Sequence, residues 1–198
     1  MPIPIFLLAL IIFTAVLAVK RQKSTRAQQE VNEAFLERER KANSTRKKDI
    51  SNLDYLPFTS EKLPIGVVSD ETIASYEAIL KNLSGKRIVN LSSFSNTDLK
   101  LMYGPANLND LTEYDDNYNT LSHTLLDYAK RMQELDHISD AITILEYAMS
   151  LSIDSSQIYL LLAKLYQQVN TPEKIEHIRT HLDTMEESFR SSVLKKLF

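Results

Sequence analysis

A short sequence pattern occurs twice near the C-terminus, and it limits the fold more than any other feature of the chain. LLDYAKRMQEL starts at Leu125, and YLLLAKLYQQV starts 34 residues later at Tyr159. Alanine, lysine and glutamine recur at equivalent places in the two copies, and the large apolar residues keep spacings of three and four. Such spacings place apolar side chains on one face of a helix. The sequence therefore predicts two equivalent helices within a short helical repeat.

The helix expected between the copies, SDAITILEYAMSL, fits the same register, with small, large and small residues at Ala141, Leu145 and Ala148. A 34-residue period of paired helices resembles the tetratricopeptide repeat family, over about residues 122–184. The resemblance implies one repeat at 122–155 and a second at 156–184. The family's large, large, small and large positions of the first helix would be Leu125, Tyr128, Ala129 and Met132, then Tyr159, Leu162, Ala163 and Tyr166.

The second copy departs from the family pattern. Ile175 and Arg179 stand where alanine and a large residue are expected, and Asp154 lacks the usual following proline. We therefore expect one good repeat and a divergent second, with a plain helical bundle as the alternative. The last stretch, SFRSSVLKKLF, predicts a helix that caps the stack, because four apolar residues share one face. These are Phe189, Val193, Leu194 and Leu197.

The N-terminal residues 1–19 are uncharged, and the run from Ile3 to Val19 is apolar. As a helix, nineteen residues span roughly 28 Å, close to the roughly 30 Å hydrocarbon core of a bilayer. This pattern predicts a transmembrane anchor. A cleaved export signal is the alternative, but positive charge follows the run instead of preceding it, and the small residues Ala15 and Ala18 are three apart instead of two.

Basic residues directly after the run orient the predicted anchor. They are Lys20, Arg21, Lys23 and Arg26. Positively charged flanks stay on the cytoplasmic side of a membrane. The sequence thus predicts a single-pass cell-membrane protein with its N-terminus outside and its C-terminal domain in the cytoplasm, a plan that resembles bacterial membrane-anchored repeat proteins.

Charge divides the rest of the chain into a basic stalk and an acidic body. Residues 20–48 hold ten Lys/Arg and four Glu, whereas the chain from Asp49 onward has a net charge of −9. The stalk lacks proline and glycine and is expected to be helical. Its apolar residues Ala27, Val31, Ala34 and Phe35 form a short seam that Arg38 interrupts. We expect a solvated spacer, with a weak homo-oligomer through the stalk as the alternative.

Residues 49–68 contain Pro57 and Pro64 among apolar side chains. This predicts an extended linker packed on the domain, or alternatively an exposed linear motif. The domain itself, residues 69–198, is expected to be all-α. Its first helix is expected after the N-cap Ser69 and before Gly85, and a short helix should end at Gly104. NLNDLTEYD predicts a further short turn-and-helix element.

Catalytic and metal chemistry find little support. The chain has no cysteine and only three scattered glycines, which excludes a thiolate site and a phosphate-binding loop. His177 and His181 have a chelating spacing but lie in HIRTH without a marked third ligand, and Asp115–Asp116 fits a turn or helix cap. We expect no cofactor, no metal and no enzyme activity. The acidic body also argues against nucleic acid as a partner.

The expected function is a membrane-anchored scaffold or adaptor that binds a protein or peptide. The family resemblance implies a groove lined by the first helix of each repeat. Two other functions stay open: an exported helical domain that binds a ligand or metal, and a regulatory subunit of a membrane enzyme complex. The groove-facing residues would be His123, Leu126, Lys130 and Gln133, then Gln157, Leu160, Lys164 and Gln167.

Overall fold

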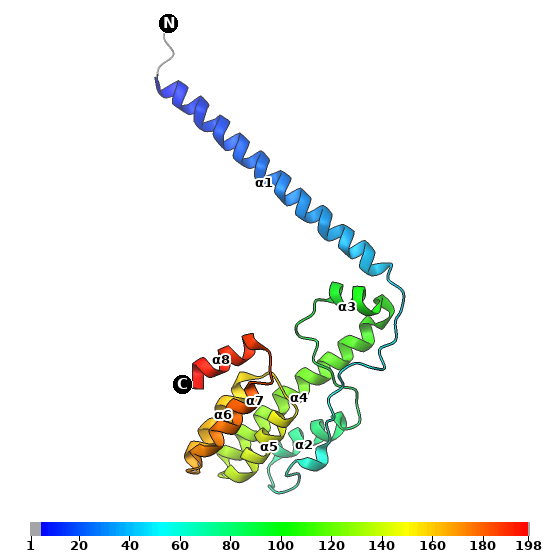
Figure 1. Cartoon of the computed structure of the whole chain (residues 1–198), viewed down its shortest axis with the longest axis vertical. Helices are drawn as coiled ribbons and strands as arrows, with labels where there is room; N and C mark the ends of the chain where they lie inside the picture. Colours follow the sequence, from blue (N-terminus) through cyan, green and yellow to red (C-terminus); the bar gives the residue numbers. More distant parts are fainter. Residues whose placement is uncertain (1–4, 198) are drawn as a thin grey trace. The chain divides into compact units, whose positions relative to one another are not determined.

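The described part of the chain is helical. A computed structural model describes residues 5–197, and within the first helix it describes the side chains of residues 10, 12–17, 20–23, 25 and 28 onward. Every regular element in this part is a helix, and no strand occurs there, which confirms the all-α prediction (Figure 1). The α-helices are α1 (Ile5–Asn43), α2 (Glu71–Leu83), α3 (Asn96–Tyr103), α4 (Leu108–Glu134), α5 (Ile138–Ser150), α6 (Ser156–Gln168), α7 (Ile175–Leu182) and α8 (Glu187–Leu197). Three short 3-10 helices are η1 (Ser60–Lys62), η2 (Pro105–Asn107) and η3 (Pro172–Lys174).

The chain divides into two compact units. One comprises the residues up to Ile50 together with Phe94–Leu108, and the other comprises Ser51–Ser93 together with the residues from Asn109 onward. The first unit takes in α3, a helix that lies far from the stalk in the sequence. It carries a net charge of +5, and the second unit carries −8.

The transmembrane prediction for residues 1–19 is wrong on the structural finding. No helix in the described residues combines the length and apolar character needed to cross a membrane. Residues 1–4 lie outside the described part, and the uncharged part of α1 ends at Val19, so it would span only roughly 22 Å. The predicted single-pass location, and the orienting role of Lys20, Arg21, Lys23 and Arg26, fail with it. The side chain of Arg26 also lies outside the described residues.

In the first unit, α3 packs against the C-terminal end of α1. Arg38 pairs with Asp98 at 2.5 Å, and Lys100 pairs with Glu39 at 3.2 Å. The Thr97 hydroxyl also donates a hydrogen bond to Glu39. These ion pairs join helices that lie about sixty residues apart in the sequence.

Gly104 ends α3 and allows the chain after α1 to pass close by. Its φ is +86°, a left-handed conformation that glycine adopts readily. A side-chain carbon there would lie 2.6 Å from the carbonyl oxygen of Arg46. The close approach is held by backbone and side-chain hydrogen bonds, because Lys48 N–H donates to Tyr103 C=O and the Asn107 amide donates to Lys48 C=O. The predicted helix end at Gly104 is confirmed.

α4 is one continuous helix of 27 residues, so the prediction of a separate short element at NLNDLTEYD is wrong. Its N-terminal half is polar, which hides the helical period. The period is nevertheless present, because Leu111, Tyr118 and Leu121 are buried at spacings of seven and three. α2 begins one residue later than expected, with Asp70 as its N-cap in place of Ser69.

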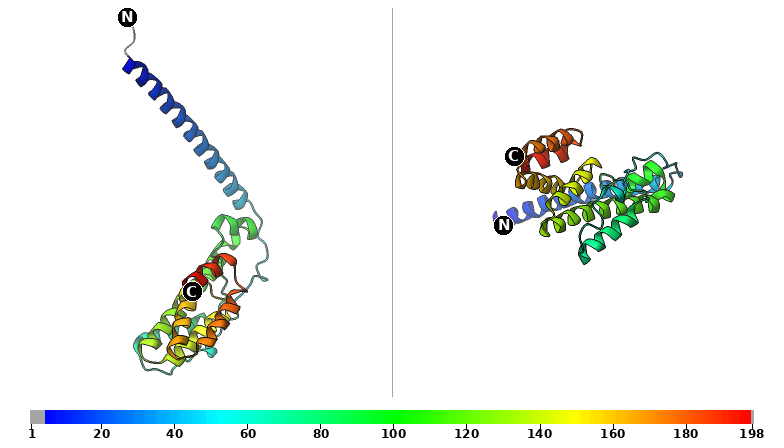
Figure 2. Two further views of the ribbon diagram at one scale, coloured as in Figure 1. Left: turned by 60° about the vertical axis from the view of Figure 1, so that its left-hand side comes forward. Right: turned by 90° about the horizontal axis from the view of Figure 1, so that it is seen from below.

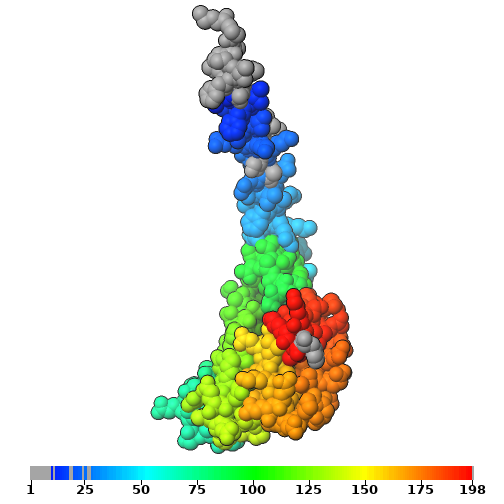
Figure 3. Space-filling model, turned by 90° about the vertical axis from the view of Figure 1, so that its left-hand side faces the viewer, coloured from blue at the N-terminus to red at the C-terminus, as the bar shows by residue number. Residues whose placement is uncertain are grey.

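The core of the second unit lies among α2 and α4–α8. α5 packs against α6, and α8 packs against α6 as well (Figure 2, Figure 3). Val193 of α8 is fully buried, and Phe189 contacts the ring of Tyr159 edge-on at 5.6 Å. The largest fully buried side chains are Tyr128, Tyr159, Tyr166, Ile73, Leu80, Ile88, Leu111, Leu121, Leu125, Met132, Ile144 and Leu145.

Each buried tyrosine hydroxyl has a partner from another segment. Tyr128 donates to Pro64 C=O at 2.9 Å, Tyr159 to the Met185 sulfur at 3.0 Å, and Tyr166 to Glu146 at 2.7 Å. Burial raises the pKa of all three phenols, because the charged form would lose its hydration. The phenols therefore stay neutral and act as hydrogen-bond donors inside the core.

The segment before α2 contributes to this core. Phe58 and Leu63 are buried in it. The ring of Phe58 stacks on Tyr147 with centroids 6.0 Å apart, and Thr59 N–H donates to the Tyr147 hydroxyl at 2.9 Å. The stacking of Phe58 and the hydrogen bond between the Thr59 main chain and the Tyr147 side chain thus fix this proline-containing stretch on the helices.

The helices α4, α5 and α6 end in the same type of turn. Three backbone hydrogen bonds at the C-terminal end of α4 recur 34 residues later at the end of α6. The one that spans the most residues is donated by His137 N–H in α4's turn and by Thr171 N–H in α6's turn. The turn residue has a positive φ in each case, 62° at Asp136 and 59° at Asn170. α5 ends in the same way, with φ 54° at Ser152. In such C-terminal turns glycine is the usual residue.

We predict that Ser152→Gly stabilises the second unit by about 0.5–1 kcal/mol, because glycine removes the steric cost of a left-handed residue and loses only part of that gain to its own flexibility. Urea unfolding followed by circular dichroism measures the change. Ser150→Gly, at the last residue of α5, is the matched control and should destabilise the protein by about 0.5 kcal/mol. A loss of stability in Ser152→Gly would contradict the assigned turn.

Candidate functional site

The residues predicted to face a groove divide into exposed and buried members. On α6, Gln157, Lys164 and Gln167 are exposed and Leu160 is half-buried. On α4, His123 is exposed, and Lys130 and Gln133 are half-buried. Leu126 is only 5% exposed and belongs to the core, so it offers no surface to a ligand. The sequence could not separate Leu126 from Leu160, because both have the same apolar character.

Lys130 lies in a hollow of about 340 Å³ between α2 and α4. Its ammonium group is 3.3 Å from the carboxylate of Asp127. Lys164 is exposed, and none of the ion pairs found among the described residues involves it. The two lysines are therefore equivalent in position along their helices but differ in how freely they can bind an anion. The hollow is lined by Thr72, Tyr76, Asp127, Lys130, Arg131 and Glu134.

α2 is held against α4 by a buried carboxylate that the sequence did not indicate. Glu77 is 7% exposed, and its Oε1 accepts hydrogen bonds from Gly66 N–H at 2.8 Å and from the Tyr128 hydroxyl at 3.3 Å. Lys81 lies 3.9 Å from the other oxygen. All of its partners come from elements already packed together, so the role of Glu77 is to join the linker, α2 and α4.

A second polar cluster joins the segment after α2 to the α5–α6 turn. Asp154 receives hydrogen bonds from the Tyr118 hydroxyl and, at 2.8 Å, from the Asn90 side-chain amide. Asp154 N–H in turn donates to the Tyr118 oxygen at 3.0 Å. Burial raises the pKa of Tyr118, which keeps its proton on the phenol. Asp154 thus joins the segment after α2 to α4 and to the α5–α6 turn.

The N-terminus of α2 carries an ion pair with two hydrogen bonds. Arg131 donates to both oxygens of Asp70, at 3.3 and 2.7 Å, and Asp70 also caps the helix through Ile73 N–H at 3.0 Å. The Arg131 hydrogen bonds, followed by the Ile73 N–H, lower the pKa of Asp70 from 3.8 to about 2. The carboxylate is therefore charged throughout the physiological range.

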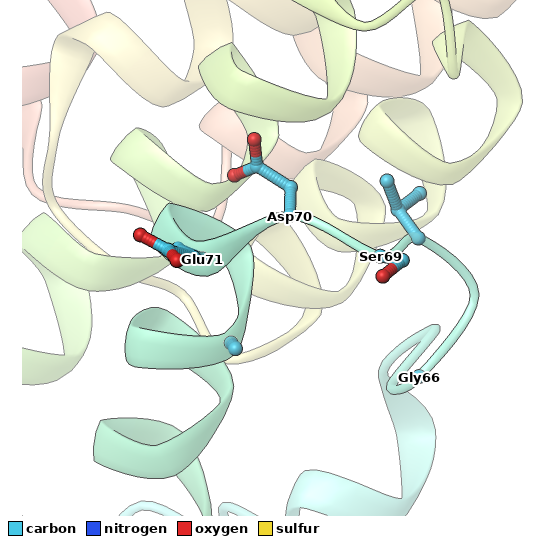
Figure 4. Close-up of a pocket in the computed structure, with 6 residues that line it drawn as sticks. Gly66, Ser69, Asp70 and Glu71 are labelled. Carbon is cyan, nitrogen blue, oxygen red and sulfur yellow. The ribbon is translucent and has the colours of Figure 1, made fainter.

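An open hollow of about 450 Å³ lies beside this cap (Figure 4). Its polar side chains do not converge. Figure 4 shows the Asp70 carboxylate, the Glu71 carboxylate and the Ser69 hydroxyl pointing in three different directions. The hollow therefore presents no set of groups arranged around one ligand atom.

We predict that the Asp70–Arg131 pair makes stability depend on acid. Because the pKa of Asp70 is lower in the folded chain than in the unfolded chain, its contribution is complete above about pH 4 and is lost as the pH falls to about 2. Urea midpoints measured from pH 2 to pH 7 should fall less steeply for Asp70→Asn, which keeps the helix cap. Asp110→Asn, at an exposed position, is the control. An unchanged pH slope in Asp70→Asn would refute the prediction.

The histidine pair does not form a metal site in the described residues. His177 is exposed, whereas the ring of His181 stacks on Tyr159 at 6.2 Å and its Nε2 is buried without a hydrogen-bond partner. Burial lowers the pKa of His181, so the ring stays neutral at pH 7. Within residues 5–197 no group of three or more His, Asp or Glu side chains is arranged to hold a metal ion.

Comparisons with known proteins give no relative. No protein-family model matches the chain, no curated protein is significantly similar to it, and no solved structure matches its fold. The tetratricopeptide resemblance therefore stays a prediction drawn from the sequence pattern.

Proposed function

We propose that this protein is a binding scaffold that holds a protein or peptide partner on the exposed side chains of α4 and α6. The observation that carries the proposal is the recurrence of a lysine and a glutamine at equivalent places on these two helices. The same three backbone hydrogen bonds recur 34 residues apart, so Lys130 and Lys164, and Gln133 and Gln167, occupy equivalent places relative to their helix ends.

The chemistry of this surface favours an acidic or carboxylate-bearing segment. Lysine supplies a cationic donor, and glutamine supplies both a donor and an acceptor for an extended backbone. Lys164 is exposed together with Gln157 and Gln167, whereas Lys130 already contacts Asp127. We therefore assign the larger share of ligand attraction to Lys164. Glu77 and Asp154 hydrogen-bond to other parts of the fold, so we do not assign them to the ligand. The exposed side chains of α4 and α6 are the ones we assign to peptide recognition.

We predict that Lys164→Glu weakens binding of an acidic peptide with a free C-terminal carboxylate by at least about tenfold, because an attraction becomes a repulsion. Lys130→Glu should have a smaller effect, since Asp127 already offsets its charge. Fluorescence polarisation with a panel of labelled peptides, each made with a free and an amidated C-terminus, measures both effects.

Lys195→Glu on α8 is the matched control, since it makes the same charge change at an exposed site. Equal losses for Lys195→Glu and Lys164→Glu would show that only net charge matters. If no peptide of the panel bound, or if binding ignored both substitutions on α4 and α6, the proposed function would be wrong.

A further inference from the structure

The helices α7 and α8 are attached to the second unit chiefly through α6. α8 packs against α6, and α7 packs against α6 and η3. Ile178 and Leu182 are the buried side chains of α7, and Val193 is the buried side chain of α8. Helices held by so few buried side chains open locally at a lower free-energy cost than the rest of a core.

His181 lies in the contact between α7 and α6. Its ring stacks on Tyr159, with the ring centroids 6.2 Å apart and the ring planes inclined by 21°. The Nε2 atom of His181 is buried, and it has no hydrogen-bond partner among the described residues. A protonated ring would carry an N–H at this atom, and that donor would lose its hydration without gaining an acceptor. Closure of α7 onto α6 therefore favours the neutral ring.

The charged groups on the surrounding elements have other partners or are exposed. The ion pairs near this contact join Arg190 to Asp183 at 3.6 Å and to Glu187, and Lys174 to Glu146 at 3.2 Å. The exposed charged or titratable residues on α6, η3, α8 and the α7–α8 turn are Lys164, Glu173, Glu186, Lys195 and Lys196, and those on α7 itself are Glu176, His177 and Arg179.

Two buried phenols of α6 complete the surroundings of the histidine. Tyr159, which His181 contacts directly, donates to the Met185 sulfur, and Tyr166 donates to Glu146. Burial, followed by the charge of Asp154, raises the pKa of Tyr159, so this phenol stays neutral. Asp154 itself accepts hydrogen bonds from a phenol of α4 and from a side-chain amide.

We propose that α7 and α8 form a pH-sensitive switch on α6, in which neutral His181 keeps the two helices closed and protonation of His181 opens them. Opening uncovers the ring of Tyr159, which Phe189 of α8 contacts edge-on at 5.6 Å when the helices are closed. The switch does not depend on the proposed peptide surface, since it involves none of the side chains assigned to that surface.

The direction of the pH effect follows from the state of the ring. Burial lowers the pKa of His181 in the closed state, whereas a solvated ring in the open state has the ordinary value of 6.5. The closed state therefore has its full stability above about pH 7.5, and it loses stability as the pH falls through 6.5, until the closed ring is protonated as well.

Hydrogen exchange of the full chain, measured by mass spectrometry and corrected for the intrinsic pH dependence of amide exchange, tests the proposal. Between about pH 7.5 and about pH 5, protection of α7 and α8 should fall by at least about threefold relative to α4 and α5. The fall should not exceed roughly thirtyfold, which is the limit for a closed ring that stays neutral and an open ring with a pKa of 6.5. Histidine NMR of the same protein should show His181 titrating at a lower pH than the exposed His177.

His181→Phe keeps a ring against Tyr159 but cannot be protonated, so its α7 and α8 should be protected equally at both pH values. His177→Phe makes the same substitution at an exposed position of α7, and it should keep the wild-type pH response. If His181→Phe does not fold, His181→Gln replaces it, because its amide is neutral too. Equal protection of α7 and α8 at both pH values in the wild type would overturn the proposal. An equal loss in α4 and α5, or a pH response that persists without His181, would overturn it as well.

Discussion

Buried tyrosines determine how the second unit is assembled. Each phenol brings a large apolar ring into the core together with a hydroxyl that has to be hydrogen-bonded. The hydroxyl of Tyr128 donates a hydrogen bond to the linker, that of Tyr159 to the α7–α8 turn, and that of Tyr166 to α5. Tyr118 and Tyr147 do the same for the α5–α6 turn and for Thr59. Segments that look like loose connections in the sequence are thereby fixed to the helices.

The carboxylates with the most partners in this unit also serve its assembly. Glu77, Asp154 and Asp70 are the carboxylates with the most elaborate surroundings, and each is committed to a backbone N–H group, a phenol, an amide or an arginine of the fold. What stays available is the outer surface of α4 and α6, which is lined by amide and ammonium groups.

The charge division of the sequence has a structural counterpart. The +5 unit contains α1 and α3, and the −8 unit contains the helical stack. α3 belongs with α1 because ion pairs across α1 and α3 hold it there, and because Gly104 lets the backbone after α1 pass within contact distance. Local sequence showed that α3 is a helix with a glycine end, but its partners lie about sixty residues away and could not be found from periodicity.

The sequence by itself determined the helical class, the 34-residue offset and the apolar faces of α4 and α6, because these depend on spacings of three and four along the chain. Only the tertiary structure decided which members of equivalent positions are exposed. Leu126 is buried where Leu160 is half-exposed, and His181 is half-buried against Tyr159 where His177 is exposed. In the described residues none of the helices is both long and apolar enough to cross a membrane, contrary to the prediction from the N-terminal run. Whether a residue is buried depends on neighbours that are distant in the sequence. A repeat pattern specifies which faces of the helices are apolar, but it does not specify which segments cover those faces.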